Sequence, residues 1–338
     1  MSMVHGNVWG IWWWRITAKG IIVDNLRKGR CSLPRYSREL ARDHRKQAAA
    51  VHEQLVKRGV PQAVPVELMY SGTIQRTGNR FVVPRQWNGF VCSGSLCVVG
   101  SDWVCAPEFC YLQVCGSIRF TVRESLAEWQ YLVILVELGC ELCGTYSKAI
   151  SKRGFKDRIT PLCSTRQLLE FLGRMAFEYG ASRAFDALRW ILDGLRSPME
   201  TVLYLMLCMP RHWGGLALPR PYANYGLEVP EHLWDKTSKR TIVPDLFWPE
   251  ANLAIEYDSD EEHTGRDHED QERQELAQDM GLKVITFRNS DMANLTRFNA
   301  KARSVATYLG WGALPLDAAF LLVQKTLRDM LMYHERWI

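Results

Sequence analysis

Three carboxylates stand close together within one short stretch of this 338-residue chain, and they are the side chains best suited to chemistry. The stretch 243–258 reads as two apolar strands joined by a polar turn. Folding the hairpin about this turn sets Asp245 opposite Glu256, with Cβ atoms roughly 5 Å apart. The two-residue period of a strand brings Glu256 and Asp258 to the same face. We therefore expect the three carboxylates to converge.

Carboxylates that face one another repel, so the cluster requires either a bound cation or a raised pKa. Ligand sets made only of oxygen atoms suit Mg²⁺ or Mn²⁺ better than zinc. A second interpretation of the same residues is an ordinary strand edge that carries its acidic side chains in solvent. The residues alone leave both interpretations open.

The elements around the hairpin follow an α/β pattern. A helix is predicted to begin at Ser197, which is followed by proline at the first helical position and by Glu200 at the third, and to end before Pro210. Downstream of it we expect a strand, the hairpin, an acidic helix, another strand and a last helix, over residues 216–229, 243–258, 267–280, 282–288 and 293–309.

The hairpin resembles the active-site hairpin of the PD-(D/E)xK nuclease superfamily, in which Pro-Asp opens one strand and an acidic-x-Lys triplet ends the next. It is more similar to a group of uncharacterised endonuclease-like domains related to very-short-patch repair endonucleases, which carry Glu-x-Asp-Gly-x-x-x-His instead. The matching residues are Glu256, Asp258 and His263, then Asp270, Arg273, Leu276 and Gly281, then the strand that ends at Arg288. Ser259 stands where glycine is usual, and Asp258 stands where most of the superfamily has lysine.

This resemblance covers about residues 197–310 and implies a restriction-endonuclease-like fold, a mixed sheet flanked by helices. It also implies that Asp245 and Glu256 bind Mg²⁺ or Mn²⁺ in an endonuclease. In the family a glutamate on the leading helix approaches the metal, which is the role of Glu200 here, although a capping box equally explains a glutamate at that position. Because Asp258 supplies no positive charge, it would act as a metal ligand or as a base.

Two further residues receive catalytic roles from the resemblance. His263 is the candidate general base, because the pKa of histidine lies near neutrality and related repair endonucleases use a histidine just after this strand. Arg273 is the candidate for stabilising the transition state. The alternatives are a surface histidine in an acidic loop and a surface ion pair between Asp270 and Arg273. Lys283 is a weaker candidate for a lysine that has moved within the motif.

The charge distribution suits an enzyme that acts on a polyanion. The chain has a formal charge of +5, and residues 257–279 hold ten acidic and two basic residues, a net charge of −8, which leaves +13 on the remainder. Residues 1–60 hold twelve Lys or Arg against four acidic residues. We interpret this segment either as a surface that faces DNA or as a basic surface arm.

The chain is expected to divide into four parts: a basic segment (1–60), a mixed α+β middle domain (61–193), the restriction-endonuclease-like domain (194–312) and a C-terminal helix (313–338). Within the middle domain we expect strands and loops over 61–115 and helices over 122–138, 165–179 and 182–195. Two stretches of it, 105–108 and 139–146, resemble the antitoxin components of abortive-infection toxin–antitoxin pairs.

The cysteines and the apolar segments do not favour a secreted, disulfide-bonded protein or a membrane protein. Most of the ten cysteines are expected to be buried, reduced thiols, and a zinc site at Cys140 and Cys143 is the alternative. No run reaches the roughly 18 to 20 apolar residues that span a bilayer. The Trp-rich run 8–14 has neither a basic region before it nor a cleavage pattern after it, so we expect a cytoplasmic protein.

The sequence therefore predicts a Mg²⁺-dependent endonuclease that hydrolyses phosphodiester bonds in DNA, in a bacterial defence, repair or mobile-element context. The alternative is a DNA-binding or antitoxin-type regulator, with a toxin or another protein as partner, whose nuclease-like domain no longer cuts. The missing lysine at Asp258 and the serine at Ser259 motivate this alternative.

Overall fold

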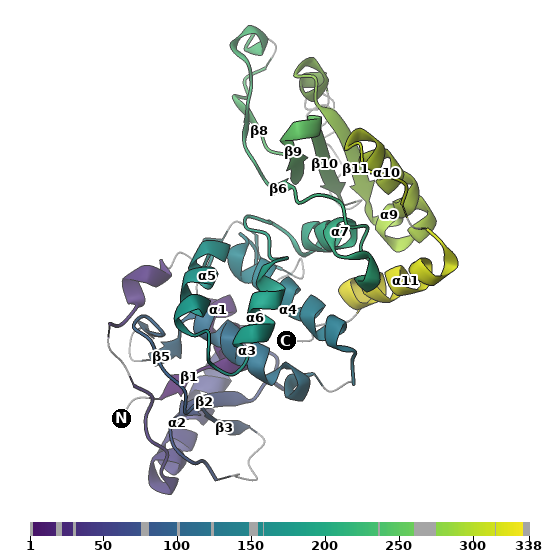
Figure 1. The fold of residues 1–338 in the computed structure, drawn as a ribbon. Coiled ribbons are helices and arrows are strands. Elements are labelled where there is room, and N and C mark those ends of the chain that lie inside the picture. The colour runs from purple at the N-terminus through teal and green to yellow at the C-terminus, as the bar shows by residue number, and fades with distance from the viewer. Residues whose placement is uncertain are drawn as a thin grey trace. The chain divides into compact units, whose positions relative to one another are not determined.

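The computed structural model describes residues 3–17, 22–29, 32–75, 81–99, 102–122, 125–148, 155–157, 159–235, 237–259, 275–314 and 316–333. The chain divides into two compact units, the first ending at Asp193 and the second beginning at Gly194 (Figure 1). Each unit contains helices and an open mixed sheet. The α/β class expected from the sequence is therefore confirmed.

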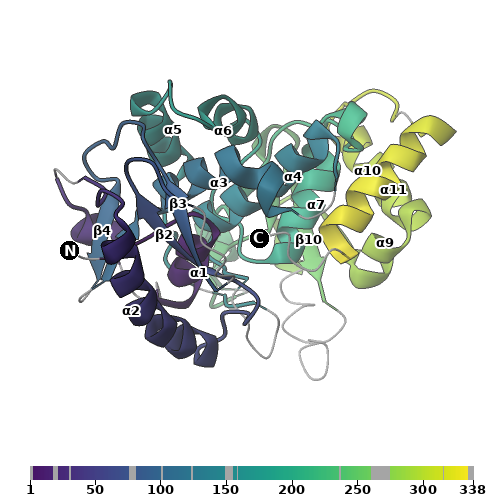
Figure 2. The same ribbon diagram turned by 90° about the horizontal axis from the view of Figure 1, so that it is seen from below.

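A five-stranded sheet in the order β3-β2-β1-β5-β4 organises the first unit. Strand β1 runs antiparallel to β2 and parallel to β5. Figure 2 shows α2 on the opposite side of this unit from α5 and α6. The elements are β1 (Val4–His5), α1 (Asn7–Thr17), η1 (Val23–Leu26), α2 (Arg38–Lys57), β2 (Val66–Tyr70), β3 (Val82–Gln86), β4 (Leu96–Val99), β5 (Asp102–Cys105), α3 (Pro107–Thr121), α4 (Glu128–Cys143), α5 (Thr165–Arg174) and α6 (Ala181–Leu188).

The tryptophan-rich run near the N-terminus forms the central helix of the first unit. The indoles of Trp9, Trp12 and Trp14 are almost completely buried in α1. Gly10 lets α1 pack tightly on α3, because a Cβ atom at this position would lie 2.5 Å from the Sγ of Cys110. The large apolar area that these rings remove from water makes α1 a core element of this unit.

The middle region is more helical than the sequence indicated. Strands and loops were expected as far as residue 115, but Pro107–Thr121 is the helix α3, which is buried on nearly all sides. A helix that is apolar all round shows no amphipathic period, and this hid it in the sequence. The three later helices exist, but α4 begins at Glu128 instead of residue 122 and α6 ends at Leu188 instead of residue 195.

All nine cysteines in the described ranges are buried, as expected for most of the cysteines from the sequence.

The second unit is built on a four-stranded sheet in the order β11-β10-β9-β6. Strand β10 pairs antiparallel with β9 and parallel with β11. In Figure 1, α9 and α10 lie beside β11. The elements are α7 (Pro198–Cys208), η2 (Arg211–Trp213), β6 (Tyr222–Ala223), β7 (Leu227–Glu228), η3 (Glu231–Leu233), β8 (Thr241–Ile242), β9 (Leu246–Trp248), η4 (Pro249–Ala251), β10 (Leu253–Asp258), β11 (Lys283–Arg288), α9 (Asn289–Ala293), α10 (Leu295–Tyr308) and α11 (Ala318–Tyr333).

Two predicted helices of the second unit form close to their expected limits. Helix α7 begins where the Oγ of Ser197 accepts a hydrogen bond from the backbone N–H of Glu200 at 3.1 Å. Helix α10 begins where the Oδ1 of Asn294 accepts from the N–H groups of Thr296 and Arg297, at 3.0 and 3.2 Å. Both starts have a side-chain acceptor for the backbone donors that a first helical turn leaves unpaired.

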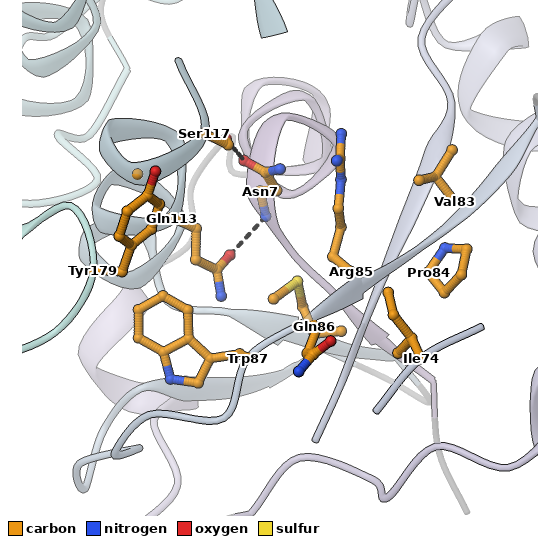
Figure 3. A pocket seen from close by; sticks show the side chains of 12 residues that line it. Asn7, Ile74, Val83, Pro84, Arg85, Gln86, Trp87, Gln113, Ser117 and Tyr179 are labelled. Atoms are coloured by element: carbon orange, nitrogen blue, oxygen red, sulfur yellow. Dashed lines mark hydrogen bonds between the residues drawn. The ribbon is translucent and has the colours of Figure 1, made fainter. Parts of the chain in front are cut away.

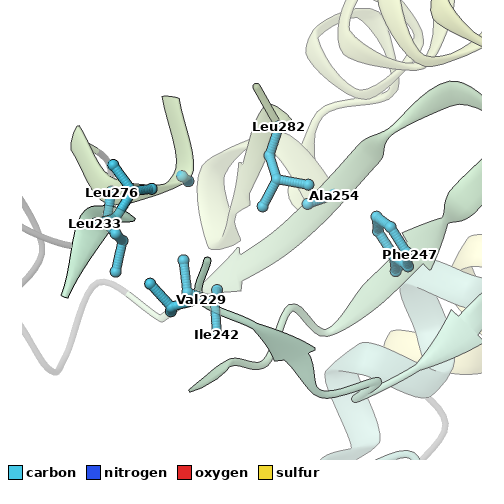
Figure 4. Packing of buried hydrophobic residues seen from close by; sticks show 8 residues of the cluster. Val229, Leu233, Ile242, Phe247, Ala254, Leu276 and Leu282 are labelled. Carbon is cyan, nitrogen blue, oxygen red and sulfur yellow. The ribbon is translucent and has the colours of Figure 1, made fainter. Parts of the chain in front are cut away.

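A small apolar core anchors the hairpin predicted from the sequence (Figure 4). Phe247 of β9 and Ala254 of β10 lie opposite each other and both belong to it. Leu276 and Leu282 join it from the chain that leads into β11. The first half of β10 is buried on both faces, because Leu253 and Ile255 are also inaccessible to solvent. Packing on both faces therefore holds this half of the strand in the core.

Candidate functional site

The predicted hairpin register is confirmed. Ile255 lies opposite Leu246, the last pair of the β9–β10 ladder, and the next step along both strands brings Asp245 to Glu256. The Oδ2 atom of Asp245 accepts a hydrogen bond from the backbone N–H of Tyr257 at 2.6 Å. Asp245 is therefore held against the end of β10, where the other two carboxylates of the motif lie.

Glu200 belongs to the same place. Its carboxylate is buried at 6% exposure near the start of α7. The Oε2 atom accepts hydrogen bonds from the backbone N–H of Arg196 at 2.9 Å and from the Nδ2 of Asn224 at 2.8 Å. Burial, with the negative charge of Asp245 next in importance, raises the pKa of Glu200 to about 7. The position of Glu200 in the first turn of α7 is explained by the helix start. Its charge interaction with Asp245 is not needed for a helix start and points to a further role.

Asn224 links these two acidic residues, and the sequence did not single it out. Its side chain donates to Glu200, and its backbone N–H donates to the carbonyl oxygen of Asp245 at 3.0 Å. Its backbone is left-handed, with φ of 49°. Its Oδ1 atom is buried and has no hydrogen-bond partner among the described residues. The only signal was local, because asparagine shortly before Gly226 is typical of a turn.

Asp258 lies beside an arginine of the neighbouring strand. Strands β10 and β11 pair Glu256 with Thr286 and Asp258 with Arg288. The Nε atom of Arg288 lies 3.5 Å from the Oδ2 of Asp258, and the arginine side chain is 59% exposed. Arg288 thus brings positive charge to the position at which the resembled family carries a lysine. In the sequence, Arg288 could be recognised only as the last residue of the predicted strand 282–288.

The suggestion that Lys283 is a displaced catalytic lysine is wrong. Lys283 pairs with Leu253, at the opposite end of the ladder from Asp258. Its ammonium group lies 4.9 Å from the centre of the Tyr308 ring. The strand rise of about 3.3 Å per residue separates these two ends by roughly 15 Å. Lys283 is therefore too far from Asp258 to take part in a site at that end of the strand.

The described residues do not bring three acidic side chains together around one point. No three His, Cys, Asp or Glu side chains in the described ranges lie close enough together to hold a metal ion, so the expected convergence of three carboxylates is not found there. His263 and Arg273 lie outside the described residues. What is present is oxygen chemistry that suits a hard cation: the carboxylates near Asp245 and the unpartnered Oδ1 of Asn224.

Comparisons of the chain with family models, curated proteins and solved structures gave no match. None of the helices in the described ranges is long and apolar enough to cross a membrane.

Proposed function

We propose that the second unit is a nuclease domain of the PD-(D/E)xK, restriction-endonuclease-like type, and that the protein hydrolyses phosphodiester bonds in DNA. One observation carries the proposal. Asp245 sits at the end of the β9–β10 hairpin beside a glutamate from the leading helix, Glu200, whose pKa is raised to about 7. Acidic residues forced together in this way are typical of sites that bind a cation for catalysis.

The cation would be Mg²⁺ or Mn²⁺, held by Asp245 and Glu256 with Glu200 and Asp258 as further ligands. Bound there, it would supply a lowered pKa for a water molecule and stabilisation of charge on the scissile phosphate. Two features support this fit. Glu200 is buried with an acidic neighbour, and the buried Oδ1 of Asn224 lacks a partner among the described residues. A hard cation satisfies both.

The remaining roles belong to groups on the chain itself. Asn224 positions Glu200 through the 2.8 Å hydrogen bond to its carboxylate. Arg288, whose Nε atom lies 3.5 Å from the Oδ2 of Asp258, is proposed to supply the positive charge of the missing lysine. His263 is proposed as the base that accepts the proton of the attacking water, and Arg273 as a stabiliser of the transition state.

The proposal is tested by incubating the purified full-length protein with supercoiled plasmid DNA and Mn²⁺ or Mg²⁺. The wild type should convert the plasmid to nicked circles, and Asp245→Asn should reduce the rate at least a hundredfold, since it removes the charge while keeping an acceptor for Tyr257. Asp235→Asn is the matched control, because Asp235 is exposed in the same unit. Absence of nicking by the wild type in either metal would contradict the proposal.

A second candidate function is a DNA-binding or antitoxin-type regulator that does not cleave. The carboxylate of Asp258 and the serine at position 259 favour it, because most of the resembled superfamily has lysine at the first position and the resembled group has glycine at the second. A regulator of this class would act in the bacterial cytoplasm with a toxin or another protein as partner. Salt-sensitive DNA binding without nicking, in protein that also fails to bind Mn²⁺, would favour this second function.

A further inference from the structure

The first unit contains a cavity that the proposed nuclease site does not use. It has a volume of about 540 Å³, in the range of pockets that take small molecules. It lies between β3 and the start of α1, with α3 beside it. Figure 3 shows Asn7, Gln113 and Ser117 on one side, Val83 and Arg85 on the other, and the rings of Trp87 and Tyr179 at one end.

The polar side of the cavity is rigid, because Asn7 is held from three directions. Its backbone N–H donates to the Oε1 of Gln113 at 2.7 Å, and its Nδ2 donates to the Oε1 of Glu67 at 3.2 Å. Its Oδ1 accepts from the Oγ of Ser117 at 3.0 Å. The backbone of Asn7 is left-handed, with φ of 53°, a conformation that is uncommon outside glycine. Backbone strain of this kind is found at binding sites more often than elsewhere.

Arg85 and Gln113 each keep a donor for a ligand after these bonds are made, and the exposed amide of Gln86 lines the cavity as well. Among the described residues, the Nε and Nη2 groups of Arg85 pair with the buried carboxylate of Glu67, and its Nη1 group remains for a ligand. One N–H of the Gln113 amide donates to the Sγ of Cys105 at 3.5 Å, which leaves the second N–H of this group. The opposite charges of Arg85 and Glu67 cancel, so the lining carries donors without net charge. This combination suits a neutral group rich in acceptors.

The walls at one end are flat. Trp87 is buried, its indole N–H donates to the carbonyl oxygen of Phe90, and its ring meets Phe109 edge to face, so it lines the cavity as an apolar wall. Tyr179 is 70% exposed, and its ring lies against Gly116, where a Cβ atom would approach it to 2.7 Å. Glycine at position 116 therefore leaves the space that the ring of Tyr179 occupies. Aromatic rings beside amide and guanidinium donors are the means by which proteins bind unstacked bases.

We propose that this cavity binds a nucleobase, with guanine preferred to adenine. The remaining donors of Arg85 and Gln113 match the two neighbouring acceptors of guanine, O6 and N7, whereas adenine presents a donor beside its N7. The base arrives either as a free nucleotide or as an unstacked base of a single strand, and the chemistry of recognition is the same for both. This proposal concerns the first unit and does not depend on cleavage by the second.

Calorimetric titration of the full-length protein with guanosine and adenosine monophosphates tests the proposal. Saturable binding should be tighter for the guanine nucleotide. Tyr179→Ala should weaken it roughly tenfold, because stacking on one aromatic ring contributes about 1–3 kcal/mol, and Tyr179→Phe should preserve it. Phe177→Ala is the control, since Phe177 is fully exposed and does not line the cavity.

A short single-stranded oligonucleotide with one guanine separates the two sources of the base. Tighter, salt-sensitive binding of the strand assigns a nucleic acid, and equal affinities assign the free nucleotide. No binding of any of these probes, tighter binding of the adenine nucleotide, or equal affinity of Tyr179→Ala and wild type would overturn the proposal. Asp245→Asn should bind the nucleotide normally, so failure of the nuclease proposal is recognised separately.

Discussion

At the scale of single residues, the site is defined by the electrostatic strain on Glu200. Desolvation disfavours its charged form, and the nearby carboxylate of Asp245 adds repulsion. Hydrogen bonds from Arg196 and Asn224 offset part of this cost. The balance is a carboxyl group whose pKa lies near neutral pH. Such a pair is costly to the fold and useful to a site that must attract a cation.

This strain predicts how stability depends on pH in the absence of metal. Because the pKa of Glu200 is higher in the folded protein (about 7) than in the unfolded chain (4.5), its contribution to the free energy of unfolding is fully present below pH 4.5. It is lost as the pH rises toward 7, and the loss amounts to about 3 kcal/mol. Urea unfolding at pH 5 and pH 8 in a chelator should show most of this decrease for the wild type.

Glu200→Gln should remove this part of the pH dependence, because an amide does not ionise. Glu228→Gln, at an exposed glutamate of the same unit, serves as the control and should behave as the wild type does. The same fall in stability for Glu200→Gln as for the wild type would show that another group titrates.

At the scale of elements, local patterns predicted the second unit better than the first. The hairpin register followed from a polar turn between two apolar strands, and the start of α7 followed from Ser197 and Pro198. Helix α3 was missed because it is buried on nearly all sides and so has no polar face to reveal its period. Asn224 was missed for another reason. Its contacts reach Glu200 and Asp245, 24 and 21 positions away, and no local pattern encodes them.

The cap of α7 is the element on which the position of Glu200 depends. Ser197→Ala removes the acceptor for the Glu200 N–H and should lower the free energy of unfolding by about 1 kcal/mol. We also expect slower plasmid nicking, since the first turn of α7 carries Glu200. Ser164→Ala is the matched control, because Ser164 caps α5 in the first unit through the Gln167 N–H at 3.2 Å. A stability equal to wild type in Ser197→Ala would refute the role of the cap.

At the scale of the whole molecule, the basic residues among the first sixty positions fall into two groups, those in ion pairs inside the first unit and those exposed on its surface. Arg15 and Arg27 are used inside the first unit, in ion pairs with Glu141 and Glu108. Others remain on the surface of α2, where Arg38, Arg42 and Lys46 are exposed at four-residue spacing and so lie along one face of the helix. This stripe is the part of the N-terminal segment best suited to contact phosphates.

The stripe predicts a change in the salt dependence of DNA binding. The double variant Arg42→Glu, Lys46→Glu should weaken binding and make the slope of log K against log salt shallower by about 2, because each lost phosphate contact removes about 0.9 from it. Fluorescence anisotropy with a labelled duplex between 50 and 200 mM salt measures both effects. Arg166→Glu with Arg174→Glu, exposed on α5, is the control of equal charge. An unchanged slope in the α2 variant would exclude the stripe from the interface.

The proposed binding of a divalent cation by the carboxylates at the end of the hairpin can be measured by titration calorimetry with Mn²⁺. The wild type should bind Mn²⁺ saturably. Glu256→Gln should weaken this binding roughly tenfold or more, whereas Glu228→Gln should leave it unchanged. Failure of the folded wild type to bind Mn²⁺ at millimolar concentration, or equal binding by Glu256→Gln, would contradict the account.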